Sequence, residues 1–160
     1  MRGTLTAGFA LSLLATATAE AQDFNFAPRV QPEVRTEAIV AHRISALAMV
    51  GANIPLGYYV RAGMAVGAGS AIGSPTALAL RADAAVRFLL DPFGDNPWGP
   101  YAGGGLTVRR EGWTRPRAGL LFVLGVEGRR GRHWTTGVEA GLGEGARLAI
   151  VLRKARTNGR

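Results

Sequence analysis

The sequence predicts an all-β fold, a single up-and-down antiparallel transmembrane β-barrel, because apolar positions alternate with charged or small ones along segment after segment. Short turn-forming stretches separate about seven such segments. The chain also contains 23 glycines and 8 prolines, too many for a helical bundle but ordinary for a β protein rich in turns. Its 160 residues suffice for one domain. Because single-chain bacterial membrane barrels have even strand numbers, we expect about eight strands, with six as the alternative.

Residues 76–90 alternate most clearly. Their charged residues, Arg81, Asp83 and Arg87, all have odd numbers, whereas the even positions carry Thr, Leu, Ala, Val and Phe. A strand would place all three charges on one face. A helix is the alternative, because Ala and Leu favour helices and Pro75 could begin one. At about 100° per residue, however, the charges would spread over much of the helix, so we predict a strand.

The first residues have the features of a cleavable signal peptide. Arg2 supplies the positive start, an apolar stretch follows, and Ala19 and Ala21 fit the small-residue cleavage rule. The apolar stretch is shorter than the ~20 residues that a spanning helix needs. We therefore predict export from the cytoplasm. The predicted divisions are a signal peptide (1–21), a flexible N-terminal segment (22–32), the barrel (33–154) and a polar tail (155–160).

The periodicity of residues 33–53 fits two structures. A helical stripe runs through Val40, Ile44 and Leu47, whereas alternation of the even-numbered residues from 44 onward fits a strand. We favour a strand over about residues 43–53, starting as early as residue 35, because the residues that follow resemble a tight hairpin connection. This segment is expected to supply the missing strand or part of it.

Further segments alternate in the same way. Residues 117–127 contain the nine-residue apolar run 118–126, which suits a membrane strand of about 9–11 residues and is too short for a spanning helix. Residues 91–97 form the longest predicted loop, with the strongest turn chemistry. The other predicted strands are residues 57–72, 98–109, 134–142 and a last strand that ends near residue 153.

The composition of the two strand faces predicts which side meets lipid. One face carries essentially no charge, whereas the other carries arginines and acids interleaved with glycine, unlike a soluble surface rich in lysine and polar residues. The predicted lumen charges are Arg61, Arg81, Asp83, Arg87, Arg109, Arg117, Glu127, Glu139, Arg147 and Arg153. The predicted lipid-facing residues are Leu78, Leu80, Val86, Phe88, Leu120, Phe122, Leu124, Leu148 and Ile150. Tyr58, Trp98 and Trp134 are expected in an aromatic girdle.

Seven of the ten predicted lumen charges are basic, which leaves two interpretations. In the first, the acids pair with neighbouring arginines and the side chains plug the lumen, as small barrels are filled by their own side chains. In the second, the surplus arginines line a narrow anion-preferring passage or a site for acidic head groups. We favour the plug.

Two motifs carry a resemblance to a known family. The sequences NIPLGYYVRAG (53–63) and WGPYAGGGL (98–106), with the predicted signal peptide, resemble the small outer-membrane β-barrel proteins of Gram-negative bacteria, many of them uncharacterised. The resemblance covers about residues 43–153 and implies architecture more than activity. It implies an outer-membrane location and contact with outer-membrane lipids, with lipopolysaccharide phosphates as candidate partners.

Several classes of chemistry receive no support. The chain has no cysteine, which excludes disulfides and thiolate chemistry, and its net charge of +8 comes from arginines spread at strand spacing rather than clustered as in a nucleic-acid binder. His42 and His133 belong to no catalytic or metal-binding motif. We therefore expect a non-enzymatic structural or interaction protein without cofactor or metal. The alternatives are a small pore or ligand-binding barrel and a soluble, secreted, lipocalin-like barrel.

Overall fold

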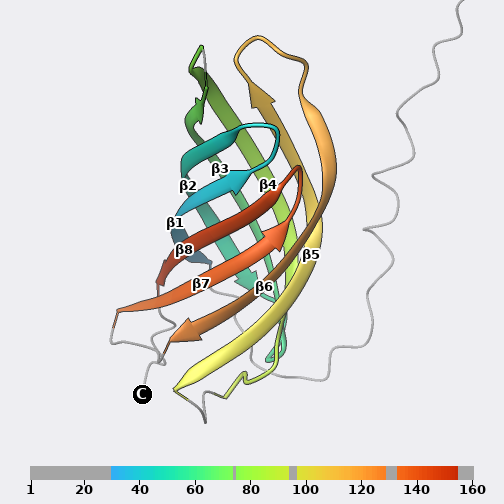
Figure 1. Ribbon diagram of the computed structural model, residues 1–160. Helices are drawn as coiled ribbons and strands as arrows, with labels where there is room; N and C mark the ends of the chain where they lie inside the picture. Colours follow the sequence, from blue (N-terminus) through green and yellow to red (C-terminus); the bar gives the residue numbers. More distant parts are fainter. Residues whose placement is uncertain (1–29, 74, 94–96, 129–132, 155–160) are drawn as a thin grey trace, which may run out of the picture.

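The computed structural model describes residues 30–73, 75–93, 97–128 and 133–154. Antiparallel strands follow one another around a barrel, which closes where the first strand pairs with the last (Figure 1). This confirms the predicted up-and-down barrel and eight strands rather than six. The strands are β1 (Gln31–Val40), β2 (Ile44–Pro55), β3 (Val60–Ile72), β4 (Ala77–Leu89), β5 (Trp98–Glu111), β6 (Arg117–Gly128), β7 (Trp134–Leu142) and β8 (Ala146–Lys154).

One parity rule runs through the whole barrel. Each ladder has a continuous register and pairs odd-numbered residues with odd-numbered ones, for example Glu33 with Arg153 and Arg81 with Arg109. Because side chains alternate between the two faces of a strand, the odd positions of every described strand point inward and the even positions outward. The strand predicted for residues 76–90 is β4, so the helix alternative is wrong.

The ambiguous segment 33–53 contributes to two strands rather than one. β1 begins at Gln31, inside the predicted N-terminal segment 22–32, and β2 extends the predicted strand 43–53 to Pro55. The helical alternative is wrong here because its stripe joins residues of two strands, on both sides of a tight turn. In this turn the backbone N–H of Ala41 donates to the carbonyl of Arg43. The predicted signal peptide and polar tail lie outside the described residues.

The barrel has two different ends. At one, here called the upper mouth, the chain turns between β1 and β2, β3 and β4, β5 and β6, and β7 and β8. The β3–β4 and β5–β6 hairpins rise above the other two there (Figure 1). At the other end, the lower mouth, β1 begins, β8 ends and the remaining connections lie. No described residue belongs to a helix long and apolar enough to cross a membrane.

Candidate functional site

The interior of the barrel is filled mainly by charged and polar side chains. Among the described residues, seven arginines and five carboxylates are buried there. Nine of the ten residues predicted to line the lumen belong to this set, whereas Arg117 is exposed at the upper mouth. The buried charged residues are Glu33, Arg35, Glu37, Arg61, Arg81, Asp83, Arg87, Arg109, Glu127, Glu139, Arg147 and Arg153.

Three of these residues were not among the predicted lumen charges, because residues 33–53 were expected to supply one strand rather than parts of two. Glu33, Arg35 and Glu37 occupy odd positions of β1 and continue the inward face. The available signal was the run of charges at alternate positions, partly hidden because Pro32 and Thr36 weaken the apolar pattern of the opposite face. β1 adds two acids and one arginine, so the interior is closer to neutral than the sequence suggested.

Asp83 on β4 is the centre of the upper part of the network. Its carboxylate accepts hydrogen bonds from Arg35 Nη2 at 2.7 Å, Arg81 Nε at 2.8 Å and Arg147 Nη1 at 3.1 Å. Thr107 Oγ1 on β5 donates a further bond at 2.7 Å. Four strands therefore converge on one buried carboxylate, which satisfies groups that would each be costly to bury alone.

Glu139 on β7 plays the same part lower in the barrel. Its carboxylate accepts hydrogen bonds from Arg87 Nε at 3.0 Å and from the Tyr101 hydroxyl at 2.9 Å. Arg147 also donates to it, and Arg35 Nη1 lies 3.7 Å away. The Glu139 side chain is fully buried. Because Arg35 and Arg147 contact both carboxylates, the Asp83 and Glu139 clusters form one continuous network.

The network continues to the lower mouth through residues far apart in sequence. Glu33 accepts hydrogen bonds from Asn53 Nδ2 at 2.7 Å and from Arg153 Nη2 at 2.7 Å. Arg153 also pairs with Glu127, whose Oε1 accepts a 2.5 Å bond from Arg61 Nη1. At the upper mouth, Arg109 donates to Ser45 and Glu111. Paired side chains therefore occupy the interior from one mouth to the other.

Small and apolar side chains fill the space between the charges. Leu47, Met49 and Ile39 pack in one buried cluster near the upper mouth, and Leu121 and Val123 pack with Ala85 in another. Gly125 on β6 leaves room for the Tyr101 ring, because a Cβ at this glycine would meet the ring and its hydroxyl. The bond from Tyr101 to Glu139 therefore depends on a glycine at position 125.

Gly125→Ala is expected to displace the Tyr101 ring and destabilise the barrel by about 1–3 kcal/mol, as overpacking does. Denaturant unfolding in detergent micelles measures the change. Gly104→Ala is the matched control, because a Cβ at Gly104 would make only ordinary contacts, the nearest at 3.5 Å. The control is expected to change stability by no more than about 0.5 kcal/mol. Equal losses in the two variants would contradict the proposed role of Gly125.

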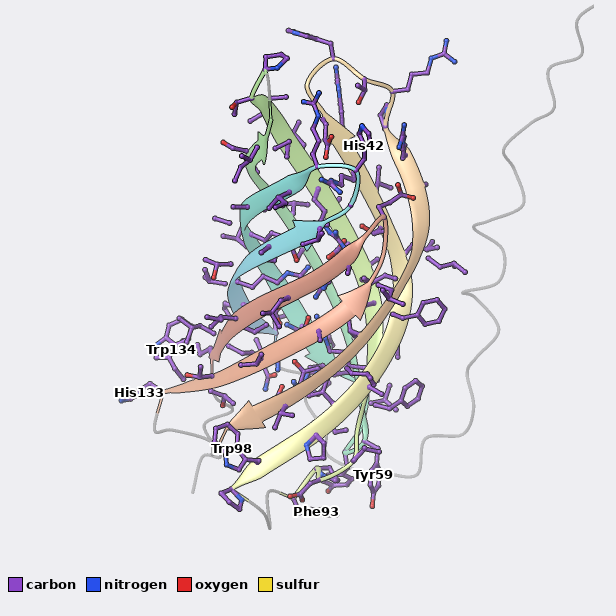
Figure 2. All side chains as sticks on the ribbon, viewed as in Figure 1. His42, Tyr59, Phe93, Trp98, His133 and Trp134 are labelled. Atoms are coloured by element: carbon purple, nitrogen blue, oxygen red, sulfur yellow. The ribbon has the colours of Figure 1, made fainter. Side chains whose placement is uncertain are left out.

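The outer surface of the barrel is apolar. All nine residues predicted to face lipid are exposed on it, at 37% for Val86 and more for the others. The predicted girdle residues Tyr58, Trp98 and Trp134 are exposed as well. Trp98 and Trp134 lie near the lower mouth together with Tyr59 and Phe93 (Figure 2). An apolar belt with an aromatic edge around a charged interior is the reverse of a soluble barrel.

The two histidines do not form a site together. His42 lies at the upper mouth and His133 at the lower mouth (Figure 2). Across the described ranges, no group of three histidine, cysteine, aspartate or glutamate side chains could hold a metal ion. Each mouth has a cavity instead, of about 1130 Å³ at the upper end and about 340 Å³ at the lower end.

Comparisons with known proteins identify the fold. No family model matches the chain, and neither does any curated protein. Neisserial surface protein A matches with a TM-score of 0.61 at 12% identity, over 79% of this chain and 96% of that one. The N-terminal β-barrel domain of Pseudomonas aeruginosa OprF matches with a TM-score of 0.56 at 10% identity, over 79% and 99%. A de novo designed transmembrane β-barrel matches with a TM-score of 0.52 at 15% identity, over 79% and 94%.

These neighbours have the architecture that the sequence resemblance implied. Two are small outer-membrane β-barrels, and the third was designed as a transmembrane barrel. The chain therefore has the fold of small eight-stranded transmembrane barrels. At these identities the likeness identifies the fold alone.

Proposed function

We propose that the chain is a non-enzymatic outer-membrane β-barrel protein with a structural or interaction role, whose lumen is closed by its own side chains. The distribution of charge carries this proposal. The ion pairs lie inside and the apolar residues face outward, the arrangement that a bilayer requires, because lipid cannot solvate charged groups. The apolar exterior argues against a soluble secreted barrel.

The paired interior supports a plug rather than a pore. A conducting lumen needs a continuous open path lined by groups that a passing ion can contact. Here, five carboxylates are distributed among seven buried arginines, and apolar clusters pack beside them. Moving an anion through would require breaking ion pairs such as those of Arg35, whose side chain is 1% exposed.

The membrane itself supplies the proposed partners. Outer-membrane lipids would cover the apolar belt, and lipopolysaccharide phosphates are candidate ligands for arginines outside the paired network. At the upper mouth, partner proteins would have to bind short connections, such as those between Val40 and Ile44, between Glu111 and Arg117 and between Leu142 and Ala146. A structural role in the membrane agrees with the small surface that these upper-mouth turns offer.

After expression in a Gram-negative host, the chain is expected in the outer-membrane fraction. In detergent gels, the unheated protein should migrate faster than the boiled protein. In planar bilayers, the purified protein should give no channel events, because the network fills the lumen. A wide bacterial porin measured in the same bilayers serves as the positive control. Recovery in the soluble periplasmic fraction would contradict the membrane assignment, and reproducible anion-selective steps would favour the pore alternative.

A further inference from the structure

The upper-mouth cavity differs from the paired interior in its charge. Five arginines and two glutamates line it, so positive charge is in excess. One of the glutamates, Glu111, is already paired with Arg109. The charged residues of the lining are Arg43, Arg109, Arg110, Glu111, Arg115, Arg117 and Glu144.

A row of arginines leads from the interior to this cavity. Arg81, Arg109 and Arg117 are cross-strand neighbours on β4, β5 and β6. Like charges in directly opposite positions repel one another, so each needs compensation. Arg81 has Asp83, and Arg109 has Glu111. The exposed side chain of Arg117 makes no ion pair or hydrogen bond with any described residue.

The cavity also has an apolar side that belongs to the outer belt. Leu78 and Leu80 line it and face outward from β4, and Leu80 is the cross-strand neighbour of Arg110. The guanidinium of Arg110 lies 5.8 Å from the centre of the Trp113 ring, which is 97% exposed. The cavity therefore joins unpaired cations to an apolar surface continuous with the belt.

We propose that this cavity binds the phosphate group of an anionic membrane lipid, with Arg115 and Arg117 as the main phosphate contacts. Arginine forms bidentate hydrogen bonds with phosphate oxygens, and both of these side chains are free to do so. The acyl chains would lie along Leu78 and Leu80. A free phosphate ion has no apolar part that could contact this surface. The inference rests on the proposed membrane location and adds a defined site and ligand class to it.

The chain offers a direct fluorescence test. It contains three tryptophans, and Trp113 is the one that lines this cavity. A Trp98→Phe, Trp134→Phe variant reports on Trp113 alone in phosphatidylcholine vesicles. Brominated phosphatidylglycerol, doped at equal amounts, is expected to quench Trp113 more than brominated phosphatidylcholine. Arg115→Gln with Arg117→Gln should weaken the preference, roughly fivefold for each arginine removed. Lys154→Gln, at the lower mouth, should leave it unchanged.

Native mass spectrometry of the protein with all three tryptophans, offered both lipids in detergent, provides a second readout that does not depend on the phenylalanine variant. Equal quenching and equal retention of both lipids by a folded, heat-modifiable barrel would overturn the inference and leave the proposed function intact. Displacement of both lipids by millimolar inorganic phosphate, with no preference for the anionic lipid, would overturn the lipid assignment. A chain that forms no barrel in vesicles would contradict the proposed function itself, and the inference with it.

Discussion

Replacing Glu139 with glutamine is expected to destabilise the barrel by roughly 3–5 kcal/mol, the cost of leaving buried charges without their partner. Glutamine keeps the shape of the side chain and removes its charge. Arg87 and Arg147 would then lose a carboxylate that no solvent can replace, because the site is fully buried. The change in unfolding free energy is measured by urea unfolding of the refolded protein in lipid vesicles. The loss of heat-modifiable migration in gels reports the unfolded fraction.

Glu111→Gln provides the matched control. Glu111 pairs with one arginine at the upper mouth, and its side chain is 26% exposed, so water can replace part of the interaction. A partly exposed pair of this kind contributes about 0–1 kcal/mol. A second substitution, Arg147→Gln, should recover part of the loss in Glu139→Gln because it restores the net charge of the buried interior, although Asp83 then keeps only two of its three arginine partners. Equal effects of Glu139→Gln and Glu111→Gln would contradict the paired interior.

Ile150→Arg is expected to cost about 2–4 kcal/mol, the penalty for a basic side chain near the bilayer midplane on the lipid face of a barrel. Ile150 lies in the middle of β8, and its cross-strand neighbours Thr36 and Val138 also face outward. Leu90→Arg is the control, since Leu90 follows the end of β4 at the lower mouth. Near the interface the same substitution costs about 0–1 kcal/mol. Equal costs, measured by unfolding in vesicles, would contradict the assigned depth.

The sequence was sufficient to predict sidedness because the parity of charged positions survives every turn. A chain whose hairpins all pair odd residues with odd residues keeps the charges of its strands on one face, apart from Arg110 and Lys154 near strand ends. Arg81 in one strand and Glu139 in another could therefore be placed inside without knowing their neighbours. β1 was not predicted as a separate strand for a local reason. Its outward face contains Pro32 and Thr36, so its alternation depends on charges alone.

The pairing of the charges could not be predicted from the sequence. Partners inside a barrel are determined by the tilt and stagger of the strands, which bring together side chains on strands that are not adjacent. Arg61 meets Glu127 across the lumen, and Arg35 on β1 reaches Asp83 on β4. Arg117 is exposed for a related reason: it is the first residue of β6, in a hairpin that rises with the β3–β4 hairpin above the other two (Figure 1). Alternation predicts the face of a residue and not its height.

The central claim is that the apolar belt faces lipid, and spin-label accessibility tests it most directly. The chain has no cysteine, so single cysteines at Leu124, Leu148 or Ile150 can be labelled uniquely. In vesicles, each label is expected to collide frequently with oxygen, which concentrates in lipid, and rarely with a water-soluble nickel chelate. Labels that collide more with the nickel chelate than with oxygen would place these residues in water and contradict the claim.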